Sequence, residues 1–188
     1  RRFGAASALT RSHRGERVSN VEVVILMGSS SDWKQLKGAV GVLEDLGISH
    51  RVHVSSAHRT PQRTIELVRQ AEDRGYRAFI CAAGMAAHLA GVVAAHTVRP
   101  VLGVPLPGGV MDGMDALLAT VQMPSGIPVA TFAVGSAGAR NAAFFAAQVI
   151  ASERPEVAEG LLRRRQEDAE RIEKAEREVA ADIEGGRA

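Results

Sequence analysis

Short apolar runs alternate along this chain with longer stretches in which apolar residues recur at helical spacing. Residues 21–27 are almost continuously apolar, with only Glu22 interrupting the run, which is typical of a buried strand. Residues 50–54 alternate polar and apolar side chains instead, as a strand with one buried face does. Such patterns predict strands at residues 21–27, 50–55, 77–82, 100–104 and 128–134. They predict helices at residues 33–46, 61–74, 86–96, 114–121 and 138–151.

The alternation of strands with helices of ten or more residues predicts the fold class. Such units form right-handed crossovers between parallel strands, so we expect an α/β protein with helices on both faces of a doubly wound sheet of about five strands. Sheets of this kind place their sites outside the carboxyl ends of the strands, where the strand order reverses. The loops after the first three strands are therefore the first places to look for chemistry.

The ends of the chain differ in composition from its centre. Residues 1–20 hold five arginines without the apolar run of a secretory signal, and we interpret them as a disordered leader. Residues 152–188 are rich in Arg and Glu, and residues 155–183 predict one long helix with few large apolar side chains. We expect this extension to pack on a neighbouring subunit and residues 21–151 to carry the chemistry.

Composition narrows the class of protein. A chain of 188 residues with 46% hydrophobic content suits one domain, and its net charge of +2 comes from mixed charges rather than a one-signed patch, which disfavours nucleic-acid binding. No apolar stretch approaches the roughly 18–20 residues that span a membrane. The single cysteine, Cys81, lies in an apolar run, so we expect a reduced, buried thiol in a cytoplasmic protein.

The loop after the second strand carries the strongest chemical signal. His58 and Arg59 precede Thr60, a candidate helix cap, and Pro61, which suits a first helical turn. An imidazole and a guanidinium thus lie beside a helix N-terminus, where an anion is readily bound. By itself the His-Arg pair is equally compatible with a solvated basic loop.

The loops after the first and third strands carry further polar groups. Ser29, Ser31 and Asp32 follow the first strand and could bind phosphate and ribose hydroxyls, although Asp32 could equally be only a helix cap. The segment is neither a dinucleotide fingerprint nor a Walker loop. Gly84 and His88 follow the third strand, and a lone His88 could be a packed histidine. No histidine pair has the spacing of a metal site, so we expect no metal.

Several separated segments together match one family in content and order. They are Met27-Gly28-Ser29-x-Ser31-Asp32-Trp33, Ser56-Ala57-His58-Arg59-Thr60-Pro61, Ala86-Ala87-His88-Leu89, Gly103-Val104-Pro105, Val121-Gln122-Met123-Pro124 and the Gly-Ile-Pro-Val-Ala segment at residues 126–130. Over about residues 21–151 the chain resembles the bacterial N5-carboxyaminoimidazole ribonucleotide mutases of de novo purine synthesis. The resemblance implies a three-layer, flavodoxin-like fold, a homo-octamer and an isomerase that uses no metal or organic cofactor.

The resemblance also implies a reaction and residue roles. Members move a carboxylate from the exocyclic nitrogen of the aminoimidazole nucleotide to ring carbon 4, by decarboxylation and recarboxylation. His58 matches the family's general acid and base. The positions that match its substrate-binding residues are Ser29, Ser31, Asp32, Ser56, Arg59, Gly84 and His88.

Two departures and two alternatives qualify this expectation. The family usually has Gly in place of Met85 and Pro in place of Ala90, and Met85 should narrow the third loop. A related carboxylase acts on the aminoimidazole nucleotide with free carbon dioxide, but its members tend to carry Lys in place of Arg59 and an Arg-Ser-Asn type third loop. A non-catalytic nucleotide-binding module on the same fold would have no need of His58.

Overall fold

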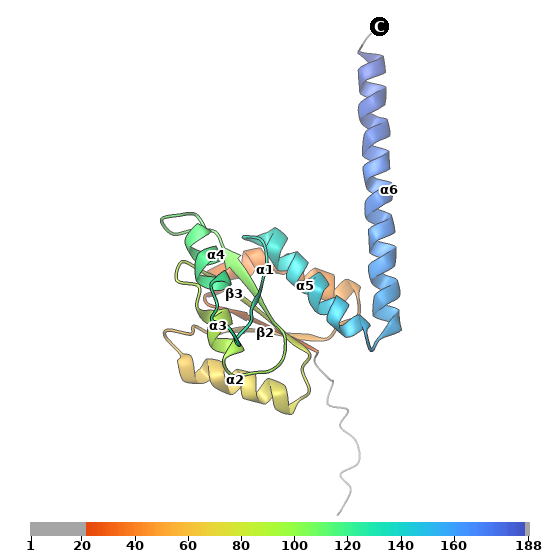
Figure 1. The fold of residues 1–188 in the computed structure, drawn as a ribbon. Helices are drawn as coiled ribbons and strands as arrows, with labels where there is room; N and C mark the ends of the chain where they lie inside the picture. Colours follow the sequence, from red (N-terminus) through yellow and green to blue (C-terminus); the bar gives the residue numbers. More distant parts are fainter. Residues whose placement is uncertain (1–21, 187–188) are drawn as a thin grey trace, which may run out of the picture.

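Five parallel strands form the centre of the molecule, in the order β2-β1-β3-β4-β5 (Figure 1). The computed structural model describes residues 22–186, so the predicted leader at residues 1–20 lies outside the described residues. The strands are β1 (Val23–Met27), β2 (His50–Val54), β3 (Ala78–Gly84), β4 (Val101–Leu106) and β5 (Ala130–Thr131). The helices are the short 3-10 turn η1 (Ser30–Asp32), α1 (Trp33–Asp45), α2 (Pro61–Asp73), α3 (Leu89–Ala94), α4 (Met114–Val121), α5 (Ser136–Ala151) and α6 (Pro155–Gly185).

Alternate residues of the central strands build two separate cores. Val23 and Ile25 of β1 pack with α1 and α5 on one face of the sheet, and Val24 packs with α2 and α3 on the other. A Cβ on Gly103 of β4 would meet side chains of both α3 and α4, so α4 also covers the second face. The predicted three-layer, doubly wound α/β fold is therefore confirmed.

The edge strands differ most from the sequence-based expectation. The prediction that β2 has one buried face is wrong, since none of its residues is fully buried and Val54 is 43% exposed. This strand lies at the edge of the sheet and pairs only with β1. At the opposite edge, β5 forms only Ala130–Thr131 rather than the predicted residues 128–134. Pattern alone does not distinguish an edge strand from an inner one.

Two side chains that were predicted to cap helices form hydrogen bonds to the preceding loops instead. Asp32 and Thr60 do stand at the N-cap positions of α1 and α2, but neither side chain hydrogen-bonds to its helix. The backbone N–H of Ser29 donates to the Asp32 carboxylate at 2.9 Å. The Thr60 hydroxyl accepts from the N–H of Ser56 and donates to its carbonyl, both at 3.1 Å. Each polar side chain therefore fixes the loop before its helix.

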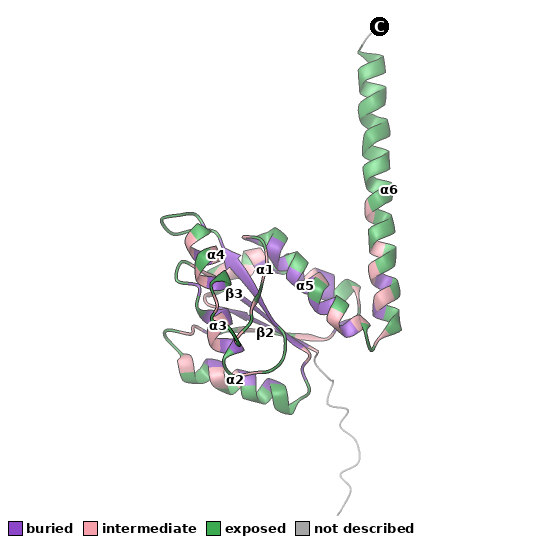
Figure 2. Cartoon of the chain, viewed as in Figure 1, coloured by how far each residue is buried: buried purple, intermediate pink, exposed green. Residues whose placement is uncertain are grey.

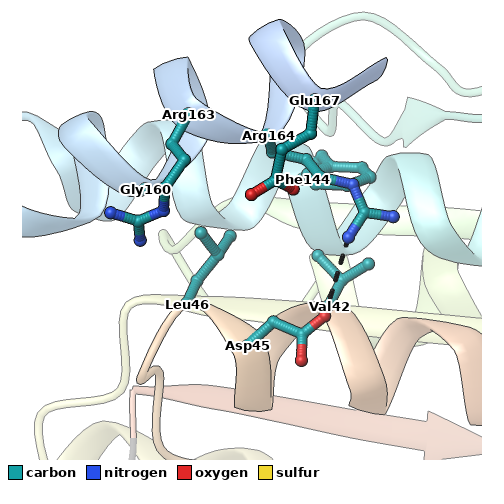
Figure 3. Close-up of a pocket in the computed structure, with 8 residues that line it drawn as sticks. All are labelled: Val42, Asp45, Leu46, Phe144, Gly160, Arg163, Arg164 and Glu167. Atoms are coloured by element: carbon teal, nitrogen blue, oxygen red, sulfur yellow. Dashed lines mark ion pairs between the residues drawn. The ribbon is translucent and has the colours of Figure 1, made fainter. Parts of the chain in front are cut away.

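The long helix α6 docks on the α/β domain through its first turns only. Val157 is fully buried, and Gly160 allows close approach, since a Cβ there would stand 2.8 Å from a methyl group of Leu46. A shallow pocket of about 240 Å³ remains between α6, α1 and α5, and Arg164 approaches Asp45 across it at 3.7 Å (Figure 3). From residue 169 to residue 186 every side chain is exposed, and the helix stands away from the domain (Figure 2).

The contact between α5 and the preceding loop gives a test of this packing. A Cβ on Gly138 would stand 1.6 Å from the carbonyl oxygen of Ala133, a backbone atom that no side-chain rotation can remove. We expect Gly138→Ala to lower the free energy of unfolding by about 3 kcal/mol or more, measured by urea denaturation. Gly41 in α1 has nothing within 4 Å of the same position. Gly41→Ala is the matched control and should raise stability by about 0.5–1 kcal/mol; equal effects would refute the close approach at Gly138.

Candidate active site

A cavity of about 570 Å³ opens at the carboxyl ends of β1, β2, β3 and β4. This edge includes the boundary between β1 and β3, where the strand order reverses and sheets of this class bind their ligands. Seven of the eight predicted site residues line the cavity, namely Ser29, Ser31, Asp32, Ser56, His58, Arg59 and Gly84. The eighth, His88, lies behind His58. The sheet thus brings together residues that are up to 59 positions apart in the sequence, between Ser29 and His88.

The loop after β1 forms a polar wall with its hydroxyls held in place. Ser29 accepts hydrogen bonds from the backbone N–H of Ser31 at 3.3 Å and from the Ser31 hydroxyl at 2.9 Å. Asp32 closes the turn by accepting from the backbone N–H of Ser29. The second oxygen of Asp32 lies 3.4 Å from the Ser31 hydroxyl. Such an array can bind the hydroxyls of a sugar and the oxygens of a phosphate.

The loop after β2 continues this wall with a cation. Its turn is held by the N–H of Arg59, which donates to the Ser56 hydroxyl at 3.2 Å. Within residues 22–186 no carboxylate forms an ion pair with Arg59, so its guanidinium can meet an anion from solution. Helix α2 begins two residues later with Pro61 at its first turn. The positive end of that helix adds to the attraction for a phosphate.

The imidazoles of His58 and His88 form a hydrogen-bonded pair. Nε2 of His58 lies 2.9 Å from Nδ1 of His88, and the two rings meet edge to face with centroids 5.0 Å apart. His88 occupies the N-cap position of α3 but makes no side-chain cap bond. One of the two nitrogens donates and the other accepts, so this contact is compatible with one imidazolium at most. The pair can therefore hold one proton beyond its neutral state and pass it to a bound molecule through His58.

A further part of the cavity lining, the apolar wall, is made mostly of small residues. Ala57, Ala83 and Gly84 contribute to it, Leu106 at the end of β4 adds a larger side chain, and the loop after β4 adds Pro107, followed by two glycines. The sequence analysis did not include this last loop among the candidate site residues. The available signal was a Gly- and Pro-rich segment that follows a fourth parallel strand and so must reach the same edge of the sheet. The lining of the cavity therefore combines polar groups with apolar side chains suited to an apolar group.

Met85 and Ala90, the two residues that differ from those usual in the family, lie in different parts of the structure. Met85 lines the cavity with a left-handed backbone (φ 56°), a conformation that glycine adopts more readily, which explains the usual glycine there. Its Cγ would lie 3.2 Å from a Cβ on Gly109, so Met85 narrows the cavity toward the β4 loop, as expected. Ala90 is only 2% exposed and belongs to the core against β4, away from the cavity.

Other chemical groups in the described part of the chain lie away from this cavity or form no cluster. Cys81 is buried in β3, and burial raises the pKa of its thiol, which leaves it unreactive. Residues 22–186 contain no group of three or more His, Cys, Asp or Glu side chains placed to hold a metal ion. Within the same residues, no helix combines the length and apolar character that crossing a membrane requires.

Comparison with known proteins identifies similar chains. The family model described as AIR carboxylase matches residues 22–171. The chain is 48% identical to the N5-carboxyaminoimidazole ribonucleotide mutase of Escherichia coli K12, over 72% of this chain and 80% of that protein. It is also 48% identical to the mutase of Pyrococcus abyssi, over 80% and 86% of the two chains. Among solved structures, the crystal structure of Treponema denticola PurE has a similar fold, with a TM-score of 0.74. Its sequence is 27% identical to this one, and the match covers 81% of this chain and 94% of that chain.

Proposed function

The chain belongs to the AIR carboxylase family, and we propose that it acts as an N5-carboxyaminoimidazole ribonucleotide mutase in purine biosynthesis. Relatives that are 45–50% identical over most of the chain bear that name. The observation that carries the proposal is the cavity itself. Its lining combines one imidazole with polar groups suited to a nucleotide and apolar side chains suited to carbon dioxide.

The polar wall binds the ribonucleotide. The guanidinium of Arg59 and the N-terminal end of α2 bind the 5′-phosphate, with the hydroxyls of Ser29 and Ser56 as further donors. The carboxylate of Asp32 accepts hydrogen bonds from the ribose hydroxyls, and Ser31 supports it. Because these groups are anchored by bonds within their loops, little ordering is needed when the substrate binds.

His58 moves one proton in each half of the reaction. As an imidazolium it gives a proton to the exocyclic nitrogen while the bond from that nitrogen to the carboxylate carbon breaks, which releases carbon dioxide and the aminoimidazole nucleotide. Ring carbon 4 then attacks the carbon dioxide. The neutral imidazole takes the proton that this carbon carries, which restores the aromatic ring and the imidazolium. An imidazole is suited to both steps because its usual pKa lies near neutrality.

The apolar wall keeps the carbon dioxide in place between the two halves. Ala57, Ala83 and Leu106 offer no hydrogen bonds to water, so a small apolar molecule is held there without competition from solvent. Gly84 at the end of β3 lets the backbone approach the aminoimidazole base of the substrate. A Cβ at Gly84 would stand 3.5 Å from the carbonyl oxygen of Leu106, at the floor of the cavity.

The residues favour the mutase over the two alternatives. The related carboxylase tends to carry Lys where this chain has Arg59, and a different third loop where this chain has Ala86-Ala87-His88-Leu89. A nucleotide-binding module without catalysis would have no use for a cavity imidazole that is hydrogen-bonded to a second imidazole. The relatives that are 48% identical to this chain are named as mutases.

The family resemblance supports a proposal on assembly and location. We propose that residues 21–151 form the catalytic domain of a cytoplasmic homo-octamer and that residues 152–188 serve in its packing. The buried, reduced Cys81 suits the cytoplasm. The exposed α6 offers a face on which subunits can meet, whereas the alanines of α5 are buried in the core of the domain.

The role of His58 can be tested by removing its proton chemistry while keeping its shape. We expect His58→Asn to lower turnover of N5-carboxyaminoimidazole ribonucleotide by about two or more orders of magnitude, the scale of general acid–base catalysis. Product-nucleotide affinity, measured by calorimetry, should change little. Near-normal turnover of His58→Asn would show that this residue does not transfer the proton.

Arg59→Ala is the matched contrast at the neighbouring position. It should weaken binding of the nucleotide much more than binding of the phosphate-free nucleoside, because only the nucleotide carries the anion that the guanidinium meets. Equal losses for the two ligands would take Arg59 out of the phosphate site. The two variants together separate chemistry from binding.

The assembly proposal predicts a particle mass. Light scattering of the full chain should give eight times the chain mass of 19.9 kDa. Removing the residues after Ala151 should lower the mass or the thermal stability, since the domain then loses the buried Val157 and the contact around Gly160. A monomer with full activity would contradict the proposal.

A further inference from the structure

Helix α6 carries a stripe of apolar side chains that nothing in the described chain covers. Leu162, Ile172, Val179 and Ile183 are large, apolar and 65%, 72%, 59% and 53% exposed. Together with Arg165, Ala169 and Glu176, which lie between them, they follow one another at alternating steps of three and four residues. This is the spacing of one face in a coiled coil. We call this face the seam, made up of Leu162, Arg165, Ala169, Ile172, Glu176, Val179 and Ile183.

The position of the seam indicates a contact outside the chain. From residue 169 onward α6 leaves the domain, and all its side chains are exposed up to residue 186 (Figures 1 and 2). Exposed apolar residues that recur along one face of a helix of this length mark an interaction surface, because helices gain most of their stability from docking. The AIR carboxylase model ends at residue 171, so Ile172, Val179 and Ile183 lie beyond the part that matches that family.

We propose that the seam pairs with the seam of a second copy of this chain, with the two helices antiparallel. In the register that suits the side chains, Leu162 lies against Val179 of the second copy and Ala169 against Ile172 of the second copy. Arg165 lies against Glu176 of the second copy. The two-fold axis then passes between residues 170 and 171, and every layer occurs twice.

Each layer of this pairing is complementary. Large apolar residues meet at the ends, the small Ala169 meets the large Ile172, and the two charges in the seam meet their opposites. The overlap from Leu162 to Val179 is about 26 Å long at the rise of an α-helix. Because each domain joins its helix at residue 155, the two domains lie at opposite ends of the pair.

Charge decides between the two possible orientations. Parallel pairing in register would place Arg165 against Arg165 and Glu176 against Glu176, and like charges in a helical seam are destabilising. Antiparallel pairing replaces both repulsions with attractions. The other possible partner, a different protein, would need no such self-complementarity in the seam.

The ion pairs along α6 support this assignment. Several charged residues off the seam are paired within the helix, as Arg164 with Asp168, Lys174 with Glu178 and Arg177 with Glu173, although others such as Arg163 and Glu167 form no ion pair within residues 22–186. Arg165 and Glu176 form no ion pair with any residue from 22 to 186. The two charges that the antiparallel register joins are therefore both available for a second copy.

Disulfide trapping in the full-length protein tests the orientation. In the double variant Leu162→Cys/Val179→Cys, mild oxidation should join chains in pairs, whereas each single variant should give little product. The two positions are about 26 Å apart along one helix, too far for a bond within a chain. The native Cys81 is buried and adds no background. Glu170→Cys, which is exposed and off the seam, measures random collision.

Charge reversal in the double-cysteine background tests the register. Arg165→Glu and Glu176→Arg should each lower the yield of joined chains, roughly tenfold, because each places two like-charged contacts in the pair. The combination Arg165→Glu/Glu176→Arg should restore it. Arg163→Glu, the same change beside the seam, should leave the yield unchanged.

Three results would overturn the proposal. Efficient joining of the single variants would mean parallel helices, and a double variant that joins no better than Glu170→Cys would mean that the seams do not meet. Failure of the double charge reversal to restore the yield would reject the register. None of these readouts depends on turnover or on an octameric mass, so they stand apart from the proposed function.

Discussion

The parallel alignment of four neighbouring strands is the constraint on which the site depends. Because β1, β2, β3 and β4 run in one direction, the loops that follow them leave the sheet at the same edge. Each loop by itself is ambiguous: a serine turn, a His-Arg step, a small-residue turn and a Gly- and Pro-rich segment. Their convergence on one cavity gives them a joint chemistry that none has separately.

Once the loops converge, local hydrogen bonds decide how rigid the site is. Asp32 and Thr60 occupy positions at which a polar side chain usually caps a helix, yet both bond to the loop instead. That choice leaves the first N–H groups of α2 without a side-chain cap, available for an anion beside Arg59. The same loops hold the polar wall in place, while alanines, leucine and proline make up the apolar wall. Binding and containment thus come from different residues of one cavity.

The sequence predicts the inner parts of this structure better than its edges. Continuous apolar runs located β1 and β3 because both strands are buried on two faces. Gly47 and Gly75, which have positive φ angles, follow the ends of α1 and α2. The exposure of β2 depends on its having one neighbour, which no local pattern records. The contact between His58 and His88 joins residues 30 positions apart, so motif content indicated both side chains but not their 2.9 Å hydrogen bond.

The central claim is that the carboxylate is moved within one cavity rather than taken from solution, and isotopic labelling tests it most directly. The substrate N5-carboxyaminoimidazole ribonucleotide would carry carbon-13 in its carboxylate and react in buffer that contains unlabelled bicarbonate. Mass spectrometry of the product would then give the fraction of label on ring carbon 4. Retention of nearly all the label is the predicted result, since the apolar wall holds the carbon dioxide until the ring captures it. Product that carries mainly unlabelled carboxylate would show capture of carbon dioxide from solution and would contradict the account.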